Sequence, residues 1–185
     1  MAKDKTAAEM KLIMIMITFG ISVPAFNFPM ETPDISLFYS NNSVIRTLKT
    51  TMTVNEGCKI DYVNKTTPDH TEFRRVYTMT SSSYYNDFKG IFINMDRTKN
   101  APPYNGMVLQ LEKGGNNESI EELVYQSDNY TCGIFSVDLW RVVGIFYELR
   151  VKNKSIRSVS PECMSKFLEK AGGANNASLN KETCQ

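Results

Sequence analysis

The chain has 185 residues, of which 42% are hydrophobic and 22% are charged, so it is long enough to bury a core as one domain. With 21 Lys and Arg against 20 Asp and Glu, its formal net charge is +1. This balance gives no electrostatic reason to expect nucleic acid as a partner. Beyond the N-terminal segment, no stretch approaches the roughly 20 apolar residues of a transmembrane helix, so no membrane span is expected there.

The N-terminal segment has the pattern of a secretory signal peptide. Three lysines, Lys3, Lys5 and Lys11, precede an apolar run at 12–23, and small residues follow up to Ala25, after which we place the cleavage site. A membrane anchor is the alternative, but the run is short for a span and no cationic stop-transfer cluster follows it. We therefore predict a secreted protein with a signal peptide at 1–25 and a single domain at 26–185.

Two further features agree with secretion. The cysteines form an even set, so two disulfides are expected, and the sequence alone allows three connectivities. Six Asn-x-Ser/Thr sequons predict a heavily glycosylated surface. The cysteines are Cys58, Cys132, Cys163 and Cys184, and the sequons begin at Asn41, Asn64, Asn117, Asn129, Asn153 and Asn176.

The body of the chain is a series of short β patterns, each rich in β-branched and aromatic residues. Clusters of Gly, Pro, Asn and Asp separate them and indicate turns. Eight strands with no helical pattern between them predict an all-β domain, either an antiparallel sandwich or a closed barrel. The expected strands are 44–52, 58–64, 73–80, 88–95, 107–113, 122–128, 130–137 and 145–152.

One helix is expected after the last strand. Ser160 is a suitable N-cap, Pro161 suits the first turn, and Gly172 ends the helix. An apolar stripe at helical spacing is expected to pack on a sheet, and it consists of Met164, Phe167, Leu168 and Ala171. Eight strands followed by a C-terminal helix packed outside are the plan of a lipocalin barrel.

The second half of the chain resembles a known family. "VYQSDNYTCGIFSV" at 124–137, "FYELRV" at 146–151 and "SPECMSKFLEKA" at 160–171 are similar to segments of the tick salivary lipocalins, the histamine-binding family. That family has a tyrosine shortly before a strand cysteine, a "YELW" strand, a "P-x-C-x-x-x-F" helix start and a last cysteine near its end. The first half matches only in the position of its cysteine and in strand number. The resemblance implies an eight-stranded antiparallel lipocalin barrel with disulfides Cys58–Cys184 and Cys132–Cys163.

The strand at 145–152 carries an acid and a base on one face, where Phe146, Glu148 and Arg150 alternate with apolar residues. On the residues alone, this face either meets water, with Glu148 paired to a cation, or lines a cavity. The resemblance implies a cavity, because Glu148 matches the "YELW" glutamate that faces the interior and binds the ammonium of the ligand. Glu121 is a looser match to a second acid of that site. The expected ligand-binding residues are Glu148, Phe146, Arg150 and Glu121.

The anchors that would complete an amine site are missing. Arg150 replaces the tryptophan of "YELW", and Arg46 and Lys49 stand where acids and aromatic residues are expected. A cationic amine is repelled by unpaired guanidinium groups. The other inward positions are expected to be apolar: Phe92, Met79, Leu109 and Phe135. We therefore predict a small hydrophobic ligand, a sterol or fatty acid, as in japanin-like immunomodulatory members of the family. The alternatives are a biogenic amine, such as histamine or serotonin, and a surface-acting binder of a host immune cell or protein.

Catalysis lacks the necessary residues. The single histidine, His70, lies in a polar stretch and is expected to be solvated. With one histidine and oxidised cysteines, neither a metal site nor a Cys-His nucleophile has enough parts. No enzyme activity, metal or cofactor is therefore expected. The single tryptophan, Trp140, is expected in a hairpin loop, packed on its neighbours or exposed as a lid or host contact.

Overall fold

A computed structural model describes five ranges of the chain: 32–53, 57–79, 81–152, 159–172 and 177–178, except for the side chains of the last pair. The predicted signal peptide lies outside the described residues, as do Asn153, Asn176 and Cys184. Within the described part, no helix is long and apolar enough to cross a membrane.

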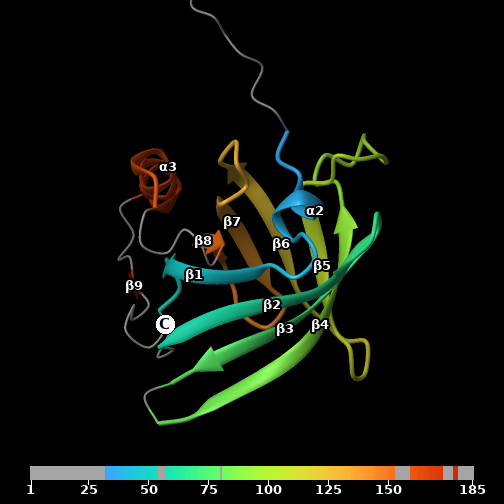
Figure 1. The fold of residues 1–185 in the computed structure, drawn as a ribbon, viewed down its shortest axis with the longest axis horizontal. Coiled ribbons are helices and arrows are strands. Elements are labelled where there is room, and N and C mark those ends of the chain that lie inside the picture. The colour runs from blue at the N-terminus through green and yellow to red at the C-terminus, as the bar shows by residue number, and fades with distance from the viewer. Residues whose placement is uncertain (1–31, 54–56, 80, 153–158, 173–176, 179–185) are drawn as a thin grey trace, which may run out of the picture. The chain divides into compact units, whose positions relative to one another are not determined.

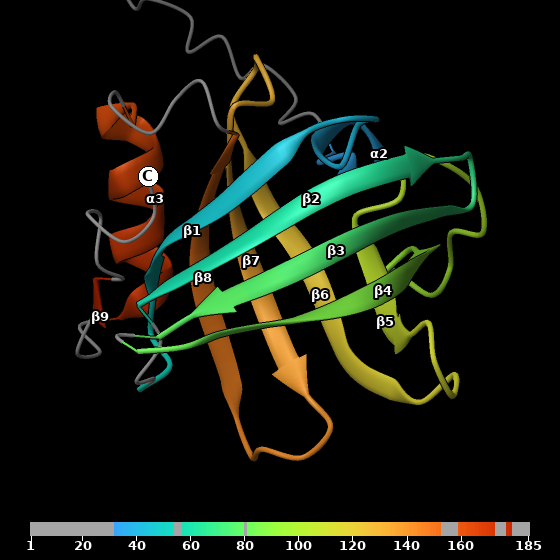
Figure 2. The same cartoon turned by 60° about the horizontal axis from the view of Figure 1, so that its bottom comes forward.

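Eight antiparallel strands close into a barrel (Figures 1 and 2). Each strand from β2 to β8 pairs with the next, and β1 pairs with both β2 and β8. Closure leaves no long unpaired edge on these strands. The strands are β1 (Val44–Thr50), β2 (Cys58–Thr66), β3 (His70–Thr78), β4 (Ser83–Ile93), β5 (Gly106–Leu111), β6 (Asn117–Gln126), β7 (Cys132–Leu139) and β8 (Ile145–Lys152). The predicted eight-stranded antiparallel barrel is confirmed.

Some boundaries differ from the sequence prediction. β4 and β6 each begin five residues earlier than expected, at Ser83 and Asn117. These starts are polar, and backbone pairing with a neighbouring strand, not an apolar pattern, holds them in the sheet. β3 includes His70, whose side chain is 16% exposed and meets the carboxylates of Asp69 and Glu72, so the prediction of a solvated histidine was wrong. A two-residue β9 (Ala177–Ser178) also pairs with β1.

A short helix that the sequence did not predict, α2 (Ile35–Phe38), covers one end of the barrel (Figure 2). Asp34 caps it by accepting a hydrogen bond from the Ser36 amide at 2.9 Å. The Phe38 ring enters the barrel beside Gly133, where an added Cβ would lie 3.0 Å from Phe38 and 2.8 Å from Leu123. The absence of a side chain at Gly133 therefore leaves room for the Phe38 ring of α2.

The barrel interior next to α2 is an apolar cluster rich in aromatic rings. Phe38 and Phe135 meet edge to face with centroids 5.2 Å apart, and Phe73 and Phe88 lie 5.7 Å apart. Its buried members are Ile35, Phe38, Tyr39, Ile45, Val63, Phe73, Phe88, Phe92, Met107, Leu109, Leu123, Phe135 and Val137. Phe92, Leu109 and Phe135 are thus inward, as predicted. Met79 is half-buried just beyond the end of β3.

The C-terminal helix α3 (Pro161–Ala171) packs on the outer face of β7 and β8 (Figure 1). Ser160 accepts a hydrogen bond from the Cys163 amide at 3.2 Å, and Gly172 ends the helix in the left-handed conformation with φ 57°. The predicted disulfide Cys132–Cys163 is present. The second predicted bridge, from Cys58, involves a cysteine outside the described residues.

The buried stripe of α3 is centred on the disulfide. Cys163, Phe167 and Ala171 are buried against an outer cluster on the barrel, whereas Leu168 is 49% exposed, so its predicted burial was wrong. The side of α3 that carries Cys163 therefore meets β7 at the bridge, and Leu168 lies on a more exposed side of the helix. The outer cluster on the barrel consists of Leu48, Cys132, Ile134, Leu149 and Val151.

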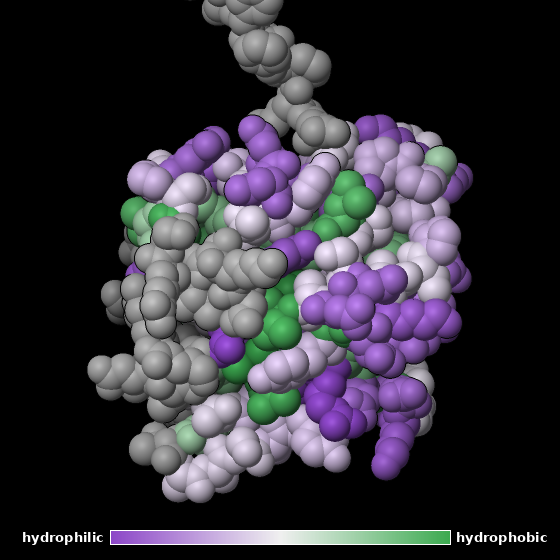
Figure 3. All heavy atoms as spheres, in the orientation of Figure 1, coloured by the Kyte–Doolittle hydropathy of each residue, from purple (hydrophilic) through white to green (hydrophobic). Residues whose placement is uncertain are grey.

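The surface is mixed. Figure 3 shows hydrophobic side chains gathered in a band across the middle of one face, with hydrophilic side chains beside it. The sequons within the described residues begin at Asn41, Asn64, Asn117 and Asn129, and all four asparagines are exposed. Their glycosylation remains a prediction.

We expect the Cys132–Cys163 bridge to be a major stabilising element. Replacing both cysteines with alanine should lower the free energy of unfolding by about 3–4 kcal/mol, because the bridge closes a 31-residue separation in the unfolded chain. Urea unfolding of the wild type and the double variant measures the difference. A loss below about 1 kcal/mol would contradict this expectation.

Candidate ligand-binding site

Six charged side chains meet inside the barrel against the aromatic rings of the apolar cluster, and we call them the charged layer. All six are buried. Three are basic and three are acidic, so the layer is neutral when every member is ionised. Its members are Lys59 and Asp61 of β2, Arg75 of β3, Glu121 of β6, and Glu148 and Arg150 of β8.

Strand register places these residues on the inner face. In β1, Thr47 is opposite both Lys59 and Arg150, so the two cations flank the same small residue. Neighbouring strands lie about 4.8 Å apart, and only long side chains can reach across β1 to meet. Phe146 is opposite Val137 of the interior cluster, so the Phe146, Glu148 and Arg150 face points inward, as predicted.

Arg75 joins two of the acids. Its Nε and Nη2 atoms donate to the two oxygens of Asp61 at 2.7 and 2.8 Å, and its Nη1 donates to Glu121 Oε1 at 2.8 Å. The guanidinium lies 5.3 Å from the Phe73 ring centroid and 5.5 Å from that of Phe88. Arg75 is therefore held by charge on one side and by aromatic rings on the other.

Arg150 joins the other side of the layer. Its Nε and Nη2 atoms donate to Glu148 Oε2 at 2.8 and 2.6 Å. Its Nη1 donates to Glu121 and, at 2.8 Å, to the hydroxyl of Tyr39, which itself donates to Asp61 at 2.8 Å. The side chain is fully buried, and its guanidinium lies 4.3 Å from the Phe135 ring centroid. Arg150 thus connects the layer to the residue that follows α2.

Lys59 and Glu148 form the most accessible pair of the layer. Lys59 Nζ lies 2.7 Å from Glu148 Oε1 and 2.9 Å from Oε2. The two side chains are 9% and 8% exposed, whereas those of Glu121 and Arg150 are 0% exposed. Around them, toward the end of the barrel opposite α2, the inward residues Leu111, Leu139 and Phe146 are only half-buried.

The electrostatics keep the two glutamates of the layer ionised. Burial alone would raise the pKa of Glu148, but Lys59 and Arg150 lower it to about 2. Burial opposes ionisation of Glu121 too, yet the two guanidinium groups and Lys59 hold its pKa well below the usual range. Both glutamates are therefore negatively charged near neutral pH.

Lys59 responds differently from its partner. Its pKa is lowered, because burial and the positive charge of Arg75 outweigh the attraction of Glu148. The pair is thus asymmetric. Glu148 has two cationic partners, whereas Lys59 has one acidic partner and two guanidinium groups nearby.

The structure brings together three of the four predicted site residues, Glu148, Arg150 and Glu121, while Phe146 lies beside them. Glu148 is paired with a lysine and an arginine, as expected for a water-facing strand, but the pairing is buried. The residues that the sequence reasoning missed are Lys59, Asp61, Arg75 and Tyr39. For the three charged residues the only signal is their alternation with outward neighbours in β2 and β3.

Two cations expected near the site are elsewhere. Arg46 is opposite Val151 and Lys49 is opposite Leu149, and both of these partners belong to the outer cluster beneath α3. The register shift in β1 between Thr47 and Lys49 places the second of them outside. The expectation that they add positive charge to the interior was wrong.

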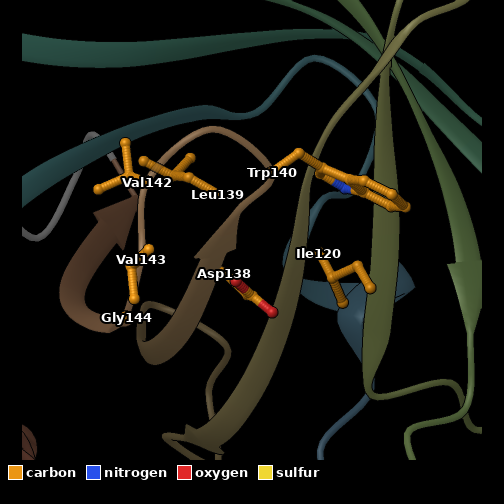
Figure 4. Close-up of a pocket in the computed structure, with 7 residues that line it drawn as sticks. All are labelled: Ile120, Asp138, Leu139, Trp140, Val142, Val143 and Gly144. Carbon is orange, nitrogen blue, oxygen red and sulfur yellow. The ribbon is translucent and has the colours of Figure 1, made fainter.

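A separate hollow of about 330 Å³ lies beside the β7–β8 turn (Figure 4). Trp140 is in this turn, as predicted, and is 59% exposed. Trp140 and Ile120 lie together at one side of the hollow, and Asp138 points toward it (Figure 4). The remaining lining residues are Leu139, Val142, Val143 and Gly144. No group of metal-binding side chains occurs in the described part of the chain.

An eight-stranded barrel with an interior polar site and an outer C-terminal helix defines a lipocalin. Several solved lipocalins share this fold. A serotonin complex of AM182 is 17% identical, with a TM-score of 0.58 over 83% of this chain and 94% of that chain. Japanin from Rhipicephalus appendiculatus, bound to cholesterol, is 13% identical, with a TM-score of 0.54 over 78% of this chain and 96% of that chain.

A further solved structure has the same fold. A bovine odorant-binding protein variant is 16% identical, with a TM-score of 0.53 over 79% of this chain and 99% of that chain. No curated protein sequence matches the chain. Residues 38–185 match the family described as tick histamine binding protein. The chain belongs to that family.

Neighbouring arginines of β3 provide a test of the charged layer. Arg75→Leu should lower the free energy of unfolding by about 3–5 kcal/mol, because it leaves Asp61 and Glu121 buried with fewer partners. Arg74→Leu is the matched control, since Arg74 makes an equivalent two-bond contact with Asp87 on the surface, and should cost about 1 kcal/mol or less. If urea unfolding gave similar losses of unfolding free energy for the two variants, the buried contacts of Arg75 would stabilise the fold no more than the surface contacts of Arg74.

The layer also predicts acid sensitivity. The folded pKa of Glu148 is about 2 and its ordinary value is 4.5, so between these values the unfolded chain binds more protons. The free energy of unfolding should therefore fall as pH is lowered from about 4.5 to 2, and Glu121 acts in the same direction. In Glu148→Gln this dependence should be weaker, whereas Glu169→Gln, on the exposed side of α3, should retain it. Urea titrations across this range decide, and equal slopes in both variants would refute the assignment.

Proposed function

We propose that the protein is a secreted, non-enzymatic tick lipocalin that holds an apolar ligand, a sterol or fatty acid, in its barrel and modulates the host immune or inflammatory response. The observation that carries the ligand class is the charged layer, in which each acid already has a basic partner. The immune role rests on the resemblance to japanin-like members and on membership of the family.

A biogenic amine would meet an unfavourable site in the layer. A bare ammonium that leaves water loses several kcal/mol of hydration unless acids replace it. Glu121 is fully buried between Arg75 and Arg150, and Glu148 is occupied by Lys59 and Arg150. An amine would therefore have to displace Lys59 from Glu148 and leave a buried lysine without its acid.

An apolar ligand needs no such exchange. It gains roughly 25 cal/mol for each Å² of apolar surface that it removes from water, and a single polar contact orients it. Half-buried Leu111, Leu139 and Phe146 provide apolar surface beside the layer. Among the proteins of similar fold, the AM182 structure contains serotonin and the japanin structure contains cholesterol, so both ligand classes are precedents. Because its acids are already paired, this barrel favours the apolar class of ligand.

A second candidate function is binding of a host protein through the surface. The β7–β8 turn favours it, because Trp140, Val142 and Val143 are 59%, 44% and 102% exposed beside the hollow. Exposed apolar side chains that gather in one place are typical of interaction sites. In this case the barrel would serve only as a scaffold.

The test is calorimetric titration of delipidated protein, secreted from eukaryotic cells, with cholesterol, oleic acid, histamine and serotonin. We expect uptake of at least one lipid and weak or absent binding of both amines. Tight binding of an amine without lipid uptake would contradict the proposed ligand class. Binding of none of the four, together with native mass spectra free of any carried molecule, would favour the surface-acting alternative.

A further inference from the structure

We propose that Lys59 is the residue that meets the polar end of the ligand and that it selects a carboxylate, so that the preferred ligand is a long-chain fatty acid. This inference rests on the proposed function, since it concerns the same barrel site. It assigns the contact to a residue that is not among Glu148, Arg150 and Glu121, the polar ligand-binding residues that the sequence predicted.

Accessibility separates the three cations of the layer. The side chains of Arg150 and Arg75 are 0% and 4% exposed, and both guanidinium groups are bound by acids on two sides. A ligand cannot reach either group without breaking these contacts. Lys59 is bound by one acid, Glu148, and its side chain is 9% exposed, the largest fraction among the three cations.

Hydrogen-bond capacity points to the same residue. An ammonium has three donors, and Lys59 uses two of them on the oxygens of Glu148. Among the described residues, no other acceptor lies within hydrogen-bonding distance of its Nζ. A third donor is therefore available to a ligand, and a carboxylate would form a charge-assisted hydrogen bond with it.

The charge around Lys59 favours an anion. Burial is the main cause of the lowered pKa of Lys59, and the positive charges of Arg75 and Arg150 lower it further, so two guanidinium groups act on its ammonium. Glu148 is the opposing charge, but its Oε2 also accepts two hydrogen bonds from Arg150. A ligand carboxylate at the third donor of Lys59 would be attracted by the ammonium and by the two guanidinium groups near it, whereas a sterol hydroxyl would gain no such attraction and an amine would be repelled by the three cations.

The apolar tail has a place beside this contact. Leu111 and Leu139 are half-buried and pack against the interior cluster. Half-buried Phe146 precedes Glu148 on the inner face of β8, and Glu148 is the acid that holds Lys59. A chain lying on these apolar residues would be covered on one side by the barrel wall while its carboxylate reached Lys59. The two contacts together define a ligand with one anionic end and a long apolar body.

The test compares oleic acid with oleyl alcohol, which has the same chain and no charge. Delipidated wild type should bind the acid at least about tenfold more tightly than the alcohol, as expected for a charge-assisted hydrogen bond in a buried site. Lys59→Met should lose this preference while retaining the alcohol. Lys59→Arg should keep a preference for the acid, and Lys89→Met, on the outer face of β4, is the control for an unrelated lysine.

Glu148→Gln gives an independent readout that leaves Lys59 in place. It removes the negative charge that competes for Lys59 and repels the ligand carboxylate, so the affinity for oleic acid should rise several-fold relative to that for oleyl alcohol. This measurement decides the question even if Lys59→Met fails to fold, as judged by its near-ultraviolet circular dichroism.

The outcomes separate the inference from the proposed function. Equal affinities for acid and alcohol in the wild type, or a preference for the acid that persists in Lys59→Met, would overturn the role of Lys59 and leave an apolar-ligand barrel standing. An unchanged or lower affinity for oleic acid in Glu148→Gln would also overturn it. Failure of the wild type to bind oleic acid, oleyl alcohol or cholesterol would overturn the proposed function as well.

Discussion

Internal charge neutrality is the constraint on which this barrel depends. Three basic and three acidic side chains leave water together, and removing charges from water costs several kcal/mol for each ion unless partners replace the lost hydration. Arg75 and Arg150 meet that requirement by bridging acids from different strands. The same bridges link β2, β3, β6 and β8 through the interior, so the polar layer fixes the arrangement of the wall while α3 and its disulfide fix the outside.

The neutrality also shapes what the site can bind. A lipocalin that binds amines needs acidic side chains that are not already paired with a basic side chain. In this barrel, Glu148 and Glu121 are paired with Lys59 and Arg150. Within the layer, the Lys59–Glu148 pair is the most accessible, and Lys59 has a hydrogen-bond donor that Glu148 does not use. In our proposal, this one contact at the edge of the layer selects the ligand. Arg150, which replaces a tryptophan of the family motif, serves inside the layer as a structural partner.

The sequence predicted the barrel, the helix and the Cys132–Cys163 bridge because each leaves a local signal: alternation, capping residues and a family motif. It predicted inward Glu148 and Arg150 for the same reason. It missed Lys59, Asp61 and Arg75, because a charged residue in an alternating strand reads as outward until the pairing across strands is known. The opposite error was made for Arg46 and Lys49, which were expected to add charge to the interior but lie on the outer face. The register shift in β1 that places Lys49 outside cannot be seen in the sequence.

Gly133 has a consequence for how molecules enter. It is opposite Arg150 on the inner wall, and its missing side chain is what lets the Phe38 ring stand inside the barrel. Any larger residue there would push that ring outward and uncover the apolar end. Glycine at this position thus allows Phe38 to fill the end of the barrel that α2 covers. The apolar end of the interior is filled by side chains of the protein, Phe38 among them, so a ligand in the proposed site would end at the charged layer.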